Sequence, residues 1–109
     1  MADVTNSETG QCLLAGACTV AKADEIHAKL LDMVARYAIL EVDRNDADEV
    51  DLSFVQLLLA ARASARLAGR TVRLARPAAG TLLDVLHRGG FLAGQTPADC
   101  AFWLQPRGA

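Results

Sequence analysis

The chain has 109 residues, of which 52% are hydrophobic and 22% charged, and its formal net charge is −2 at pH 7. This length fits one domain, which buries roughly two-thirds of the surface of its unfolded chain. No apolar run approaches the ~20 residues of a membrane-spanning helix, and the polar segment Met1–Gly10 lacks the apolar core of a secretory signal, so we expect a cytoplasmic protein.

The charges are unevenly distributed. Residues 1–51 carry four basic and eleven acidic side chains, whereas residues 52–109 carry seven arginines and two aspartates. Such asymmetry is one indicator of nucleic-acid binding. We interpret the arginines as dispersed rather than as one basic cluster, however, and expect Trp103 to be the only nearby aromatic residue that could stack on a base. We therefore interpret the charges as solvated surface and expect no nucleic-acid partner.

The first half of the chain predicts a strand, a helix and a second strand. Gln11–Ala15 has the pattern of a short strand, which Gly16 ends. In Ala23–Arg36, apolar residues recur at helical spacing on one arc and charged residues lie on the opposite arc, which predicts an amphipathic helix. Ala38–Val42 is the next predicted strand, and a loop then leads to a short extended continuation at Glu49–Val50.

The second half continues the alternation. A helix is predicted from Ser53 to about Ala68, with one apolar stripe that includes Ala68. Gly69 follows it and is a residue type that commonly ends helices. A strand at Thr71–Ala75 follows, then a helix after Pro77, and Cys100–Leu104 is predicted to be a last strand. Strands that alternate with helices across short loops indicate an α/β sheet with at least some parallel pairing.

The cysteines and histidines form no pattern that is typical of a metal or catalytic site. Cys12, Cys18 and Cys100 form no CxxC pair, and we interpret all three as small buried side chains. His27 and His87 are sixty residues apart and have no third ligand in pattern. No phosphate-binding loop, nucleophile elbow or carboxylate pair is present, so we expect no metal, no cofactor and no enzyme activity.

An acidic group precedes the predicted helix at Ser53. If it were a calcium loop that begins at Asp43, Asp48 would occupy the position that requires Gly, and Phe54 the position of the closing Glu. The pattern therefore favours a solvated loop. The group consists of Asp43, Asp46, Asp48, Glu49 and Asp51.

Ser53 has the chemistry of a helix N-cap, because its hydroxyl can accept a bond from an unpaired backbone N–H of the first turn. Gln56 lies three residues later, so the pair is typical of a capping box. The free N–H groups and the helix dipole also favour a phosphate at this position. Ser53 is therefore interpreted either as a cap alone or as a regulatory phosphorylation site.

The segment Asp51–Phe54 resembles the Asp-Ser-Ser/Thr-Gly segment of the STAS domain family, the anti-sigma factor antagonists, with Ser53 at the phosphorylated position. Leu67–Leu74 is similar to that family's helix end and following strand, and Leu82–Phe91 to its late helix. The resemblance runs from about Gln11 to Phe91 and implies a single STAS-like domain at residues 11–109, with a mixed β-sheet packed by α-helices. The chain departs from the family pattern at three positions, which hold Thr19, Leu52 and Phe54.

The resemblance implies a non-enzymatic signalling adaptor that switches protein partners through the phosphorylation state of Ser53. Its partner would be a serine kinase that is also an anti-sigma factor, or another signalling protein of a chemotaxis-type pathway. The alternative is an accessory subunit that docks on the ATPase of a lipid-transport complex without phosphorylation. Leu59 either belongs to the interface or is covered by a neighbouring helix. The expected partner-binding residues are Asp51, Leu52, Ser53, Phe54, Gln56, Leu59, Arg62 and Ala63.

Overall fold

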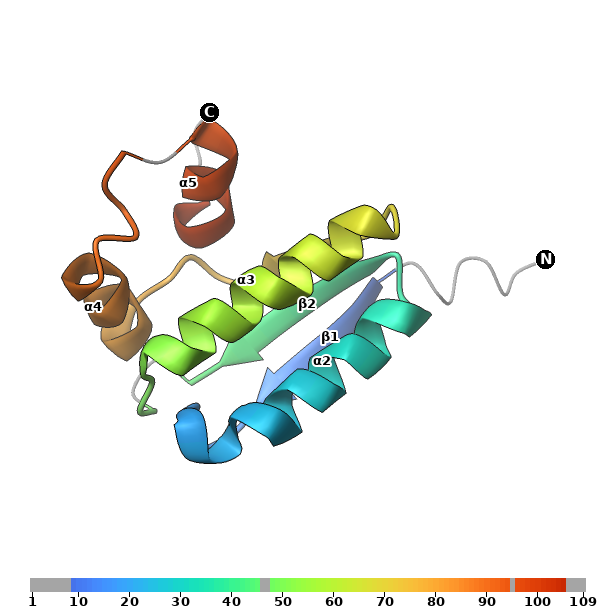
Figure 1. Ribbon diagram of the computed structural model, residues 1–109, viewed down its shortest axis with the longest axis horizontal. Helices are drawn as coiled ribbons and strands as arrows, with labels where there is room; N and C mark the ends of the chain where they lie inside the picture. The colour runs from blue at the N-terminus through green and yellow to red at the C-terminus, as the bar shows by residue number, and fades with distance from the viewer. Residues whose placement is uncertain (1–8, 46–47, 95, 106–109) are drawn as a thin grey trace.

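The computed structural model describes residues 9–45, 48–94 and 96–105. Three strands form one sheet in the order β1-β2-β3, and both pairings are parallel. Helices α2 and α3 contact each other and lie over one face of this sheet (Figure 1). The elements are β1 (Thr9–Leu14), the 3₁₀ turn η1 (Val20–Lys22), α2 (Ala23–Arg36), β2 (Ile39–Arg44), α3 (Leu52–Leu67), β3 (Thr71–Leu74), α4 (Gly80–Arg88) and α5 (Pro97–Leu104).

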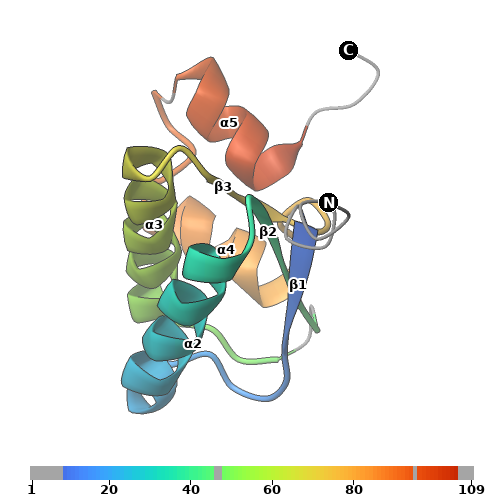
Figure 2. The same ribbon diagram turned by 90° about the vertical axis from the view of Figure 1, so that its right-hand side faces the viewer.

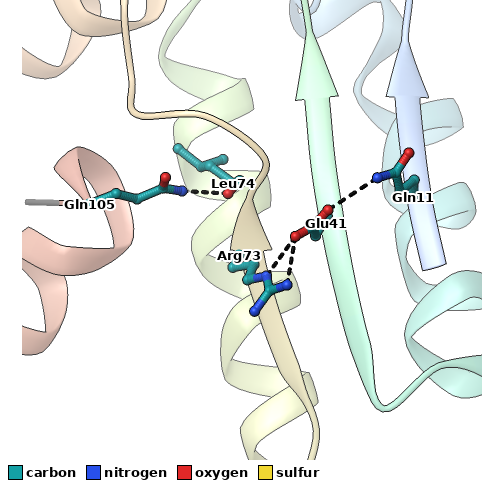
Figure 3. A network of polar contacts seen from close by, with 5 residues as sticks. All are labelled: Gln11, Glu41, Arg73, Leu74 and Gln105. Carbon is teal, nitrogen blue, oxygen red and sulfur yellow. Dashed lines mark hydrogen bonds and ion pairs between the residues drawn. The ribbon is translucent and has the colours of Figure 1, made fainter. Parts of the chain in front are cut away.

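The strands alternate between buried and solvent-facing residues, as expected when helices cover one face of a sheet. Figure 2 shows α2 and α3 together on one side of β1 and β2. The other face carries a polar row in register, in which Glu41 of β2 accepts bonds from Gln11 of β1 and Arg73 of β3 (Figure 3). The largest fully buried side chains are Trp103, Phe54, Leu30, Leu40, Leu58 and Leu86.

The α/β class and the single helix-packed domain are confirmed, and every pairing between the described strands is parallel. The predicted helix Ala23–Arg36 has the observed bounds, and Gly69 follows the C-cap of α3 with a φ of +74°. Val50 forms an isolated parallel bridge with Cys18, so the extended continuation is short but present. Cys12 and Cys18 are buried as predicted, whereas Cys100 is only half-buried.

The predicted last strand at Cys100–Leu104 is wrong, because these residues belong to helix α5. Thr96 caps this helix, its Oγ1 accepting a bond from the N–H of Asp99 at 3.2 Å, and Pro97 occupies the first turn. The helix places Trp103 in the core with 1% of its surface exposed. A run of five apolar residues does not distinguish strand from helix by itself, and the capping signal lies upstream of it.

Helix α5 packs beside the outer edge of β3. Ala78 donates its N–H to the carbonyl of Trp103 at 2.7 Å, and the Gln105 side chain donates to the carbonyl of Leu74 (Figure 3). Ala68, which was expected on the buried stripe of α3, is exposed because the helix ends one residue before it. None of the helices in the described ranges is long and apolar enough to cross a membrane.

Candidate functional site

Helix α3 begins at Leu52, and Asp51 is its N-cap. The Asp51 Oδ1 atom accepts a bond from the backbone N–H of Ser53 at 3.0 Å. The expectation that Ser53 caps the helix is therefore wrong, and with it the capping box to Gln56. Asp and Ser are both good N-caps. Because the helix starts at Leu52, the residue at the N-cap position is Asp51 and not Ser53.

Ser53 is the second residue of the helix and is half-buried. Its hydroxyl donates to the same Oδ1 atom of Asp51 that receives its N–H. The carboxylate thus holds Ser53 by both its backbone and its side chain. The serine still lies in the first turn, where free N–H groups and the helix dipole favour negative charge.

The second carboxylate oxygen of Asp51 connects α3 to the segment before α2. Asp51 Oδ2 accepts a bond from the N–H of Val20 at 2.9 Å. The backbones of the two segments are also joined, since Cys18 donates to the carbonyl of Glu49 at 2.8 Å and accepts from the N–H of Asp51 at 3.3 Å. The start of α3 and residues 18–20 therefore form one unit.

Two large apolar side chains are exposed in this unit. Val20, whose N–H binds Asp51, is 71% exposed, and Leu52, the residue after Asp51, is 46% exposed. Exposed apolar side chains beside a hydrogen-bonded hydroxyl and carboxylate have the composition of a protein contact surface, which combines apolar area with polar groups that fix orientation. We call this surface the α3 tip; it consists of Val20, Asp51, Leu52 and Ser53.

The hydrogen bonds at the α3 tip act on the ionisation of Asp51. The Ser53 hydroxyl is the main cause that lowers the pKa of the Asp51 carboxyl, and the N–H groups of Val20, Ser53 and Phe54 lower it further, against a smaller opposing effect of burial. Donors that bind the charged form favour it over the protonated form. Asp51 is therefore an anion at neutral pH, and its charge lies directly beside the Ser53 oxygen.

Arg44, at the end of β2, supports the loop that leads to the α3 tip. It is 8% exposed and donates to the carbonyl of Asp48 at 2.6 Å and to Oγ1 of Thr81 at 2.8 Å. Asp48 in turn accepts a bond from the N–H of Gly16 at 3.0 Å. The Thr81 hydroxyl also donates to the Asp48 carbonyl, so Arg44, Asp48 and Thr81 form one hydrogen-bonded group, which a buried guanidinium needs. The sequence did not indicate this role, because Arg44 and Thr81 are 37 residues apart and meet only in the folded chain.

The remaining predicted partner-binding residues are spread along α3. Phe54 is 1% exposed and belongs to the core, while Gln56 and Ala63 are exposed. Leu59 is half-buried and packs against the core. Arg62 lies near the far end of the helix, where it pairs with Asp99 of α5. The structure thus brings together Asp51, Leu52 and Ser53, and adds Val20, which the sequence did not indicate.

The acidic residues before α3 act separately. Asp43 pairs with Arg76 at 3.0 Å, Asp48 binds Gly16 and Asp51 caps the helix, while Glu49 is exposed. Asp46 lies outside the described residues. Within the described part of the chain, no three His, Cys, Asp or Glu side chains come close enough to hold a metal ion.

A protein-family model described as "Mlab, STAS domain" matches residues 1–92 of the 109. The chain belongs to the STAS domain family. This match covers the sheet, α2, α3 and α4, and it ends before α5. Searches of the curated proteins and of the solved structures returned no match to this STAS domain. Membership favours a role in protein–protein interaction and agrees with the resemblance carried by Asp51–Phe54.

Proposed function

We propose that this STAS domain is a non-enzymatic, cytoplasmic signalling adaptor that exchanges protein partners through phosphorylation of Ser53, in a sigma-factor or chemotaxis-type pathway. The observation that carries the proposal is the bond between the Ser53 hydroxyl and the Asp51 carboxylate, which also binds the N–H of Val20. A change at Ser53 therefore acts on the whole α3 tip.

In the unphosphorylated state, the α3 tip is a small surface with one anion, the Asp51 carboxylate, whose oxygens accept hydrogen bonds. Asp51 is neutralised in part by its hydrogen bonds and by the helix dipole, and the exposed side chains of Leu52 and Val20 flank it. A partner can cover this surface without burying an unpaired charge. The likeness to anti-sigma factor antagonists supports a kinase, or another signalling protein, as that partner.

Phosphorylation changes this surface in two ways. The ester consumes the hydroxyl hydrogen, so the Ser53 bond to Asp51 is lost. The phosphate then adds about −1.5 to −2 charges beside the Asp51 carboxylate. The helix dipole stabilises one anion there, but the phosphate and the neighbouring Asp51 carboxylate repel each other. This repulsion moves the Asp51 side chain and weakens its bond to the N–H of Ser53 or of Val20. A partner would then have to desolvate the phosphate, which favours release.

A second candidate is the accessory subunit that docks on the ATPase of a lipid-transport complex without phosphorylation. One observation favours it: the Ser53 hydroxyl is already engaged by Asp51, and the following residue is the buried Phe54 rather than Gly. Both features make the α3 tip rigid, as suits a constitutive interface. In that case Ser53 contributes only its small size and its hydrogen bond.

The test is affinity purification of the tagged wild-type chain, Ser53→Ala and Ser53→Asp from the native cells, with mass spectrometry of the partners and of phosphate on Ser53. Ser64→Asp is the matched control, because Ser64 is exposed on the same helix, away from the tip. The proposal expects phosphate on Ser53 and one partner that Ser53→Asp loses and Ser53→Ala retains. A partner that is kept by all variants, with no phosphate on Ser53, would favour the accessory subunit.

A further inference from the structure

Four arginines that fall within twelve residues of the sequence line one groove at the other end of α3, which corrects the interpretation that the arginines are dispersed. The groove lies between the last turn of α3, the outer edge of β3 and helix α5, and its volume is about 300 Å³. Arg62 and Arg66 come from α3, Arg70 from the following turn, and Arg73 from β3. We call it the arginine groove; Val72 and Phe102 complete its walls.

Two of these arginines are already held by carboxylates. Arg62 pairs with Asp99 at 2.9 Å and places its guanidinium 4.7 Å from the centroid of the Phe102 ring. Arg73 donates two bonds to Glu41, at 2.9 and 2.6 Å (Figure 3). Both guanidinium groups are therefore fixed in position before any ligand arrives.

The other two arginines have no carboxylate partner among the described residues. Neither Arg66 nor Arg70 makes an ion pair there, although the Arg66 charge contributes, after the Arg62 and Thr96 hydrogen bonds, to the lowered pKa of Asp99. Four arginines against Asp99 and Glu41 leave a net charge of +2. Like charges one turn apart, as at Arg62 and Arg66, destabilise a helix. One cation near the helix C-terminus interacts favourably with the helix dipole, but this interaction does not explain why four arginines lie there.

A backbone donor faces the same groove. Thr71 and Ala75 give their N–H groups to Ala38 and Val42 of the neighbouring segment, both at 2.9 Å. Since successive residues of a strand direct these groups to opposite edges, the N–H of Val72 faces the outer edge of β3, where the groove lies. Further along the same edge, the Gln105 side chain donates a bond to the Leu74 carbonyl (Figure 3).

We propose that the arginine groove is a binding site for a phosphate group carried by a small anion or a lipid headgroup. A net charge of +2 matches a phosphate dianion, and planar guanidinium groups bind phosphate oxygens in pairs. Single-stranded nucleic acid fits less well, because Phe102 and Trp103 are 6% and 1% exposed and offer no free ring for a base. All four arginines lie within the family match to residues 1–92, whereas Phe102 of the groove wall lies beyond it.

The experiment titrates the wild-type chain with pyrophosphate, monitored by calorimetry and by amide NMR shifts. We expect saturable binding with shifts at Val72 and Arg70. The double variant Arg66→Gln/Arg70→Gln should bind about tenfold more weakly or worse. The control Arg36→Gln/Arg88→Gln removes the same two charges from exposed i,i+4 pairs on α2 and α4, and should stay within about twofold of wild type.

A second arm separates the two sources of phosphate. Flotation with phosphatidylcholine vesicles, with and without phosphatidic acid, tests the headgroup. Binding of pyrophosphate alone assigns the groove to a small anion, whereas binding of phosphatidic acid vesicles that Arg66→Gln/Arg70→Gln abolishes assigns it to a headgroup. Absence of saturable binding in both arms would overturn the proposal, as would an equal loss in both double variants. The shifts of the wild-type chain decide the matter even if a variant fails to fold.

Discussion

At the residue scale, the Asp51 carboxylate accepts bonds from three donors through two oxygen atoms and so connects two segments. Oδ1 holds the backbone and hydroxyl of Ser53, and Oδ2 holds the N–H of Val20. Loss of this side chain therefore removes a helix cap and a tertiary bond at once, whereas loss of the Ser53 hydroxyl removes one donor only. We therefore expect Asp51 to contribute more to stability than Ser53, although the two residues share a hydrogen bond.

This difference predicts the order of two alanine variants. Asp51→Ala should lower the free energy of unfolding by about 0.5–2 kcal/mol, the usual cost of an N-cap, while Ser53→Ala should cost less. Urea denaturation followed by circular dichroism measures both. A greater loss in Ser53→Ala than in Asp51→Ala would mean that the serine, and not the aspartate, caps α3.

The lowered pKa of Asp51 predicts a pH dependence. Because hydrogen bonds from Ser53 and from backbone N–H groups hold the folded pKa below the unfolded value of about 3.9, the charged carboxylate stabilises the fold at pH values above it. This contribution is lost as the pH falls through the folded pKa. The stability gap between wild type and Asp51→Asn, measured by urea midpoints, should therefore be wider at pH 7 than at pH 3. A gap that does not narrow in acid would contradict this role.

At the element scale, the sequence pattern predicted helices α2, α3 and α4 and failed on α5, the shortest α-helix of the described residues. The fourteen residues of α2 show a full amphipathic pattern, and their bounds were predicted correctly. The eight residues of α5 do not, and Cys100–Leu104 was interpreted as a strand. The arginine groove could not be predicted either, because Asp99 and Phe102 reach Arg62 only through the packing of α5. The Asp51–Phe54 segment was located correctly because its capping bonds are local, although the cap is Asp51 rather than Ser53 and the bonds to Cys18 and Val20 could not be foreseen.

Helix α5 should contribute strongly to stability, although it lies beyond the family match. Trp103 is fully buried and its ring contacts that of Phe102 edge-on, with the centroids 4.7 Å apart. Trp103→Ala should cost about 3–5 kcal/mol, whereas Leu67→Ala, at a side chain that is 92% exposed, should change stability by less than about 0.5 kcal/mol. Urea denaturation followed by circular dichroism measures both. Similar costs for the two variants would mean that α5 does not pack in the core.

At the scale of the whole molecule, α3 separates two surfaces of different chemistry. Its first turn carries the α3 tip, with the Asp51 anion, and its last turn borders the arginine groove. Sixteen residues of helix span about 24 Å, so the two surfaces share no contacts.

This separation predicts additivity. In the triple variant Ser53→Asp/Arg66→Gln/Arg70→Gln, the losses in partner binding and in pyrophosphate binding should each equal those of the separate variants, within about 0.5 kcal/mol. Calorimetry with each ligand measures them. A partner affinity that depends on pyrophosphate would show that the two surfaces are coupled through α3.

The central claim is that phosphate on Ser53 releases the partner that the α3 tip binds. The direct measurement is calorimetry with the purified partner and the chain phosphorylated at Ser53, with the unphosphorylated chain and Leu52→Glu for comparison. Leu52 is exposed beside the serine, whereas Leu59 packs on the core, so Leu52→Glu tests the surface without disturbing the fold. We expect phosphorylation and Leu52→Glu each to weaken binding by about tenfold or more, while Ser53→Ala binds as wild type does. Equal affinity of the phosphorylated and unphosphorylated chains would contradict the account.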